Sequence, residues 1–270
     1  MTAEPTRARV APLWRELRYA GELARLLADG RLRDRGGARD PQPVLLIPGF
    51  MAGDASLGVL RAWLERRGHS VATSGMRVNV DCTERIVGRL QAQLRALAAE
   101  TGRSVFLIGQ SRGGAMARCL AVRDPDATAG LAMLGAPVRD PLAISAPVRQ
   151  AVRLMARLGD LGLPGMFSSG CRDGDCCAGV WRDLEAPLAP HIRALAVYSR
   201  SDGIVDWRAC MDPCARAVEV DSSHCGMSVH PDVYELLARE LERTQAAPSR
   251  PAAGARRSQR PRGSAAEALG

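Results

Sequence analysis

The stretch Gly109-Gln110-Ser111-Arg112-Gly113 follows an apolar run, residues 105–108, and precedes a run compatible with a helix, residues 114–121. A strand, a G-x-S-x-G turn and a helix in that order are typical of a nucleophile elbow. Such a turn is so tight that the serine is held in a strained backbone conformation, with its hydroxyl clear of the sheet. A side chain at either end of the motif would clash, so both ends are glycine. We predict that Ser111 is a catalytic nucleophile; the alternative is a Gly-rich structural turn.

Apolar runs and helical patterns alternate on both sides of this motif. Strands are expected at 44–47, 69–73, 104–108, 130–134, 195–198 and 217–220, and helices at 57–67, 83–99 and 233–241. The run 44–47 is apolar throughout, which indicates a strand buried on both faces of a parallel sheet. The alternation predicts an α/β fold with a mainly parallel sheet flanked by helices. Catalytic residues are then expected on loops at the carboxyl ends of the strands.

A serine hydroxyl needs a base that removes its proton. The chain contains four histidines: His69, His191, His224 and His230. His224 lies in the loop after the last expected strand, where a hydrolase places its general base. His230 lies at the expected start of the last helix and is the weaker candidate. We predict that His224 is the base.

The base needs a carboxylate that fixes its tautomer and stabilises its charged form. Asp202 lies in the loop that leaves the expected strand 195–198, and Gly203 allows the backbone to turn away. Asp206 is expected to begin the next helix as a cap or as a solvated acid, and Asp140 is a third candidate. With Asp202 as the acid, the chain order is serine, aspartate, histidine, as a nucleophile elbow of this kind requires.

Two backbone N–H groups are expected to bind the oxyanion that forms during acyl transfer. One belongs to Arg112, the residue after the nucleophile, and the other to Phe50, in the loop after the first core strand. Met51 is the alternative to Phe50. The Arg112 side chain is expected either to contact an anionic substrate or to point out along its helix and pair with an acid.

The remaining segments define the domain organisation. Residues 41–245 are expected to form one α/β domain, and 139–193, which contains no convincing strand, is expected to be a lid or cap over an apolar pocket. Residues 1–40 contain an amphipathic helix and a loop; the helix either packs on the domain or binds a lipid or partner surface. The tail, 246–270, is rich in Pro, Ala, Ser and Arg and is expected to be disordered.

Composition excludes several functions. The chain contains no lysine, so neither a Schiff base nor a lysine-dependent phosphate loop is possible. Of the net charge of +8, the tail contributes +4 and residues 1–40 contribute +3, so the rest of the chain is nearly neutral. A nucleic-acid-binding surface is therefore not expected, and no cofactor is predicted. The sequence leaves the oligomeric state open.

Eight cysteines are many for a cytoplasmic protein, and six of them lie between 171 and 225. The first residues lack the pattern of a signal peptide, and no apolar run approaches the length of a membrane span, so a cytoplasmic location is expected. The cysteine spacings do not match the usual zinc pairs. Buried free thiols are therefore expected, with disulfides as the alternative, and no metal is predicted.

Four motifs together resemble the α/β-hydrolase superfamily, and most closely its bacterial lipase/esterase-like members. They are residues 45–50, 108–114, 198–205 and 222–227, and the resemblance covers about residues 43–243. It implies a carboxylic ester hydrolase that works through an acyl-enzyme on a small-molecule or lipid ester. Two features depart from the pattern: Pro48-Gly49 replaces the familiar His-Gly, and the lid is rich in cysteine. A thioesterase or acyltransferase with the same triad, or a non-catalytic surface-associated binding protein, are the alternatives.

Overall fold

A computed structural model describes residues 8–32, 40–173 and 175–245 of the 270-residue chain. Six strands form one sheet in the order β2-β1-β3-β4-β5-β6, and every neighbouring pair is parallel. They are β1 (Pro43–Ile47), β2 (Ser70–Thr73), β3 (Val105–Gln110), β4 (Thr128–Leu134), β5 (Arg193–Tyr198) and β6 (Arg216–Glu219). The predicted α/β fold with a parallel sheet is confirmed.

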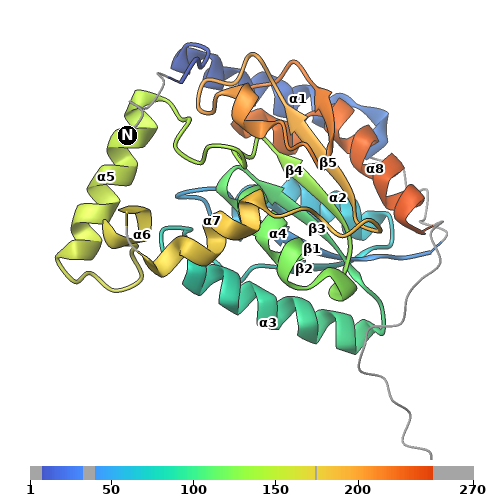
Figure 1. Ribbon diagram of the computed structural model, residues 1–270. Coiled ribbons are helices and arrows are strands. Elements are labelled where there is room, and N and C mark those ends of the chain that lie inside the picture. Colours follow the sequence, from blue (N-terminus) through green and yellow to red (C-terminus); the bar gives the residue numbers. More distant parts are fainter. Residues whose placement is uncertain (1–7, 33–39, 174, 246–270) are drawn as a thin grey trace, which may run out of the picture.

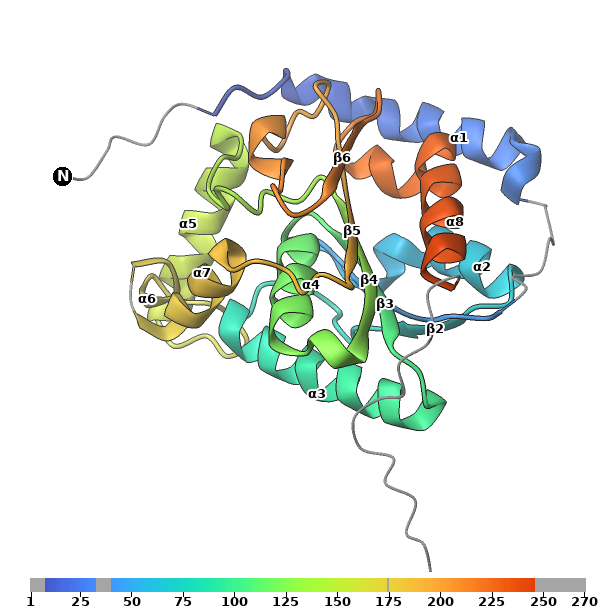
Figure 2. The ribbon, with the colours of Figure 1, turned by 45° about the vertical axis from the view of Figure 1, so that its right-hand side comes forward.

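Helices cover both faces of the sheet (Figures 1 and 2). On one face lie α3 (Thr83–Thr101), α4 (Arg112–Arg123) and α7 (Ala178–Glu185). On the other lie α1 (Tyr19–Ala28), α2 (Gly58–Arg66) and α8 (Pro231–Gln245). Figure 2 shows these two layers on opposite sides of the strands. The loops at the carboxyl ends of the strands therefore extend from a sheet that is packed on both faces.

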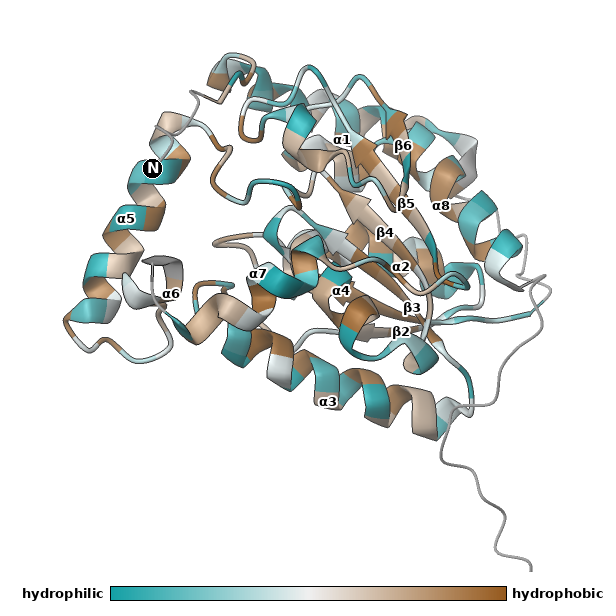
Figure 3. Cartoon of the chain, in the orientation of Figure 1, coloured by the Kyte–Doolittle hydropathy of each residue, from teal (hydrophilic) through white to brown (hydrophobic). Residues whose placement is uncertain are grey.

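Strand β1 shows why its sequence is apolar throughout. Leu45 and Ile47 pack into the core on the α3 and α4 side, whereas Val44 and Leu46 pack into the core on the α2 and α8 side. All five residues of the strand are buried. Successive side chains of a strand point to opposite faces, so a strand covered on both faces needs an apolar residue at each position. The hydrophobic colouring of the central strands follows this pattern (Figure 3).

The turn between β3 and α4 has the tight geometry that its sequence predicts. Ser111 has a φ of 53°, in the left-handed region that a residue with a side chain rarely adopts. A Cβ atom on Gly109 would clash with the backbone of Gly113, and one on Gly113 would clash with the carbonyl oxygens of Ile47 and Pro48. The predicted clash at both ends of the motif is therefore confirmed.

The segment between β4 and β5 does not behave as one insertion. It contains α5 (Ala146–Asp160), α6 (Gly170–Asp173) and α7. Helix α7 packs against α4 and places Val180 and Leu184 in the core, so it belongs to the helix layer and not to a cap. Helix α5 has no buried residue and lies at one side of the molecule (Figure 1). The predicted lid over 139–193 therefore extends too far, because its C-terminal part includes α7. A lid role for α5 stays a prediction.

The N-terminal segment consists of a 3-10 helix, η1 (Leu13–Arg18), followed directly by α1. Leu26 of α1 is fully buried in the core, as packing on the domain requires. Three apolar side chains of η1 are nevertheless exposed: Leu13, Trp14 and Leu17. The expected disorder of 246–270 concerns residues outside the described ranges. Among the helices that the structure describes, none combines the length and hydrophobicity that a transmembrane span requires.

The elbow geometry makes a prediction about stability. Gly109→Ala should lower the free energy of unfolding by about 1–3 kcal/mol or more, because its Cβ has no space against the backbone of Gly113. Gly88→Ala is the matched control: Gly88 lies inside α3, and a Cβ added there would meet nothing within 4 Å. That variant should gain about 0.5–1 kcal/mol. Urea denaturation measures both, and equal stability of Gly109→Ala and the wild type would contradict the close approach.

Candidate functional site

Asp202 and His224 form a buried pair at the carboxyl ends of β5 and β6. The Asp202 Oδ2 and His224 Nδ1 atoms are 2.6 Å apart. The other carboxylate oxygen, Oδ1, accepts the backbone N–H groups of Ile204 at 2.8 Å and Val205 at 2.7 Å. Asp202 is 2% exposed and His224 is 4% exposed. The turn after β5 therefore fixes the carboxylate, and the carboxylate orients the imidazole.

The alternative acids and base lie elsewhere. Asp206 accepts the backbone N–H groups of Arg9 and Arg208, and it caps the 3-10 helix η6 (Trp207–Cys210) as its position in the sequence suggests. Asp140 accepts the N–H of Leu142 in its own turn. His230 contacts Asp232 at the start of α8. The geometry thus favours Asp202 and His224 over these candidates.

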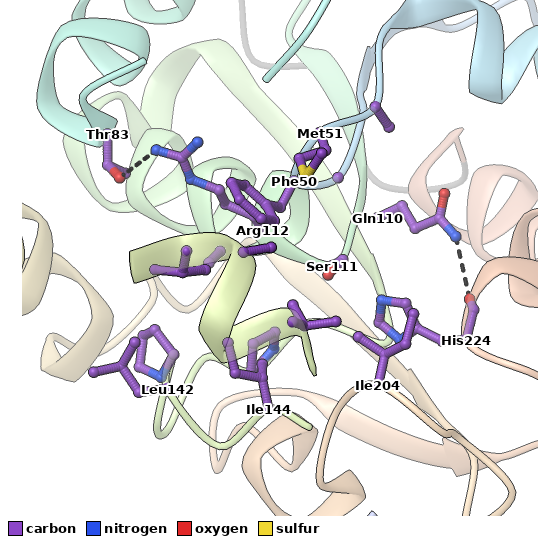
Figure 4. Close-up of a pocket in the computed structure, with 18 of the residues that line it drawn as sticks. Phe50, Met51, Thr83, Gln110, Ser111, Arg112, Leu142, Ile144, Ile204 and His224 are labelled. Carbon is purple, nitrogen blue, oxygen red and sulfur yellow. Dashed lines mark hydrogen bonds between the residues drawn. The ribbon is translucent and has the colours of Figure 1, made fainter. Parts of the chain in front are cut away.

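Ser111 and His224 line one cavity of about 680 Å³ (Figure 4). The Ser111 N–H donates to the carbonyl of Leu134 at 2.7 Å, which ties the elbow to the end of β4. A Cβ atom on Gly49 would lie 3.2 Å from the Ser111 Cβ, and one on Gly135 would lie 3.1 Å from the His224 ring. Glycine at these two positions therefore leaves room for the serine and the imidazole at the floor of the cavity.

The predicted oxyanion donors can be compared by their backbone contacts. The N–H of Met51 donates to the carbonyl of Asn79 at 3.2 Å, so it is already engaged. Within the described ranges, no acceptor is found for the N–H of Phe50 or of Arg112. Both residues line the cavity next to Ser111. This arrangement favours Phe50 over Met51 as the partner of Arg112.

The Arg112 side chain does not point outward to an acid, so that interpretation is wrong. Its guanidinium donates to both the backbone and the side-chain oxygen of Asn79, at 3.1 and 2.8 Å. It also donates to the carbonyl of Asp81 at 2.6 Å and to the Thr83 hydroxyl at 2.9 Å. Burial lowers the pKa of Arg112 to about 10. The side chain thus fastens the elbow to the loop before α3 (Figure 4).

Two N-terminal carboxylates, which the sequence did not reveal as site residues, reach the loops that carry Asp202 and His224. Glu16 Oε1 accepts the backbone N–H groups of Gly203 at 2.9 Å and His224 at 3.0 Å, and its Oε2 accepts the N–H of Cys225 at 3.1 Å. One side chain of η1 therefore binds both Gly203, which follows Asp202, and His224. These contacts span about two hundred positions of sequence, so no local pattern could reveal them.

Glu22 of α1 makes a second, deeper contact with the same loop. Its carboxylate accepts the N–H of Ser223 at 2.8 Å and the Ser223 hydroxyl at 2.6 Å. A Cβ on Gly226 would clash with this carboxylate, so the glycine is required for its approach. Gln110, beside the nucleophile, donates its side-chain amide to the carbonyl of His224 at 3.2 Å. The loop that carries His224 is therefore held from both the N-terminal segment and the elbow.

The electrostatic surroundings favour the charged form of His224. Burial lowers the pKa of His224, but the Asp202 carboxylate and, to a smaller extent, Glu16 outweigh it, so the pKa is raised above its ordinary value. A raised pKa means that the neutral, proton-accepting form predominates only at higher pH. Activity that depends on this base should therefore fall as the pH drops through the raised pKa.

Glu16→Gln tests the influence of the N-terminal segment on the base. Removing the negative charge should shift the acid limb of the pH–kcat/KM profile to lower pH, because Glu16 raises the pKa of His224. The amide oxygen of glutamine can still accept the N–H groups of Gly203 and His224, whereas the amide nitrogen that replaces Oε2 cannot accept the N–H of Cys225. Glu22→Gln is the control, since Glu22 bonds Ser223 of the same loop. An acid limb that stays in place in Glu16→Gln, or that moves equally in both variants, would contradict the electrostatic role.

Comparisons with known proteins address the fold. The family model described as serine aminopeptidase, S33 (Hydrolase_4) matches residues 56–174, which is less than half of the chain. This range includes Ser111 but ends before Asp202 and His224. No curated protein matches the chain.

Three solved structures share the fold at low sequence identity. The mature lipase BlEst2 of Bacillus licheniformis has a TM-score of 0.56 at 14% identity, over 76% of this chain and 94% of that chain. Monoglyceride lipase of Saccharomyces cerevisiae has a TM-score of 0.54 at 15% identity, over 77% of this chain and 87% of that chain. A structure whose description names LipS and LipT, two metagenome-derived lipolytic enzymes, has a TM-score of 0.54 at 18% identity, over 77% of this chain and 95% of that chain. The sheet, the elbow and these likenesses together show that the chain has the α/β-hydrolase fold.

Proposed function

We propose that the protein is a serine hydrolase that cleaves carboxylic esters through a Ser111–His224–Asp202 triad. The observation that carries this proposal is the 2.6 Å contact between Asp202 and His224, at a cavity that the strained Ser111 also lines. A base oriented by a buried carboxylate, beside a serine on a nucleophile elbow, has the arrangement that acyl transfer requires.

The proposed reaction proceeds through an acyl-enzyme. His224 removes the proton of the Ser111 hydroxyl as its oxygen attacks the ester carbonyl, and Asp202 stabilises the imidazolium that forms. The N–H groups of Phe50 and Arg112 bind the oxyanion. His224 then protonates the leaving alcohol, and the serine remains acylated. Water, deprotonated by His224, then attacks the acyl group, and His224 returns that proton to the Ser111 oxygen as the acyl–oxygen bond breaks and the acid is released.

The cavity lining favours an apolar acyl chain. Aliphatic and aromatic side chains from several elements surround Ser111: Phe50, Leu142, Ile144, Val148, Val152 and Phe167. Val148 and Val152 come from α5, so the amphipathic helix turns an apolar face toward the cavity. A cavity of this size and character suits an aliphatic ester.

An aminopeptidase activity, suggested by the description of the matching family model, is less well supported. Such an enzyme must bind the substrate ammonium group through a free anion. Glu16 is the only acidic side chain among the described residues that line the cavity. Its two oxygens already accept three backbone N–H groups. A thioesterase or acyltransferase would use the same triad, and product analysis distinguishes these from an ester hydrolase.

Substitution of the triad tests the proposal. Purified wild type should hydrolyse p-nitrophenyl esters with a preference for medium or longer acyl chains. Ser111→Ala and Asp202→Asn should each lower kcat/KM by about 10³–10⁴-fold or more. Asp206→Asn is the matched control among the acids and should retain activity, since Asp206 caps η6 instead. Hydrolysis that survives in Ser111→Ala, or a folded wild type inactive on every ester, would count against the proposal.

We further propose that η1 places the protein against a lipid surface. Trp14 is 65% exposed and Leu17 is 81% exposed, although Glu16 of the same segment faces the domain. Exposed aromatic and aliphatic side chains on a surface helix are typical of interfacial binding. The basic residues of 1–40 would favour anionic lipid.

A vesicle assay tests this surface. Trp14→Ser combined with Leu17→Ser should reduce co-sedimentation with anionic phospholipid vesicles, because the apolar contact area is lost. Val78→Ser is the control, since Val78 is also exposed but lies outside η1. Unchanged vesicle binding by the double variant, or no binding by the wild type, would contradict a lipid-facing role for η1.

A further inference from the structure

Four cysteines from two distant parts of the sequence meet beside the cavity. They are Cys82, at the start of α3, and Cys171, Cys176 and Cys177, in the segment before α7. All four Sγ atoms lie within 4.8 Å of one another. The Cys82 and Cys177 sulfurs are 3.8 Å apart, and the Cys176 and Cys177 sulfurs are 3.7 Å apart. None of the four is in a disulfide.

This spacing has a specific chemical meaning. Four sulfurs bound tetrahedrally to one zinc ion at about 2.3 Å lie about 3.8 Å from one another. Both sulfur–sulfur distances given above agree with that value. We propose that Cys82, Cys171, Cys176 and Cys177 bind one zinc ion in a closed, four-thiolate site. The cysteine spacings do not match the usual zinc pairs, and Cys82, which completes the set of four ligands, lies far from the other three in the sequence.

The surroundings suit a negatively charged metal–thiolate group. Cys82 is the N-cap of α3 and Cys177 is the N-cap of α7, so the positive ends of two helices face the sulfurs. The Arg112 guanidinium hydrogen-bonds to Asp81 and Thr83, the two neighbours of Cys82. A zinc ion with four thiolates is doubly negative, and these groups offset its charge. The nearby Asp81 carboxylate is paired with Arg85 and Arg89.

The proposed site is structural and not catalytic. Four protein ligands leave no open position for water or substrate, which is the arrangement of structural zinc. Cys82, Cys171 and Cys177 are partly or fully buried, and the exposed Cys176 provides a route for the metal. Cys171 and Cys177 line the cavity. The ion would therefore tie the segment before α7 to the start of α3 and fix that wall of the pocket.

Metal analysis of the full-length protein tests this inference. Wild type purified under reducing, anaerobic conditions and supplied with zinc should retain about one zinc per chain after desalting, measured by mass spectrometry of the metal. Cobalt(II) in its place should give the intense visible bands and the thiolate charge-transfer absorption of a tetrahedral sulfur site. Cys171→Ser combined with Cys176→Ser should lose both signals. Cys214→Ser, an exposed cysteine outside the cluster, should keep them.

Thermal unfolding supplies a second readout. A strong chelator should lower the Tm of the wild type and of Cys214→Ser but leave that of the double variant unchanged. Ser111→Ala should bind zinc like the wild type, so the metal result is independent of ester hydrolysis. A folded wild type that binds no zinc or cobalt, a double variant that retains full metal, or a disulfide among the four that persists under reducing purification would overturn the assignment.

Discussion

The left-handed backbone of Ser111 is the constraint on which the rest of the site depends. A residue with a side chain adopts this conformation only where its surroundings enforce it. Here β3 lies in the middle of the sheet, and Gly109 and Gly113 allow the strand and the helix to come into backbone contact. The loop after β1 then passes close to the serine at Gly49. One packed junction therefore positions both the proposed nucleophile and the proposed oxyanion donors.

The proposed base, His224, is held by three hydrogen-bonded carboxylates, of which those of Asp202 and Glu22 are buried and that of Glu16 is half-buried. Asp202 binds the imidazole, while Glu16 and Glu22 bind the backbone on both sides of it. A buried carboxylate is costly unless its oxygens are hydrogen-bonded, and each of these three accepts at least two donors. The N-terminal segment is thus part of the site. It couples the position of His224 to a surface helix that also exposes Trp14 and Leu17.

The sequence predicts the features that depend on residues close together in the chain and does not predict those that depend on contacts between distant segments. The central strands were predictable because a strand covered on both faces must be apolar throughout, and the elbow because its turn demands glycine. The Asp202–His224 pairing followed from the position of each residue after a strand. Contacts between distant segments carry no such signal. Three such contacts depend on how the helices pack: those of Glu16, those of Arg112 with the loop before α3, and the contact between Cys82 and Cys177. The position of α7 in the core depends on helix packing too, so the sequence did not show that the expected lid ends before α7.

Mapping a covalent inhibitor adduct tests the central claim most directly. Wild type treated with an alkyl fluorophosphonate should gain the mass of one phosphonyl group, and peptide mass spectrometry should locate it on Ser111. His224→Ala should react far more slowly, because the hydroxyl then lacks its base. An adduct on another residue, or equal labelling rates in wild type and His224→Ala, would contradict the account.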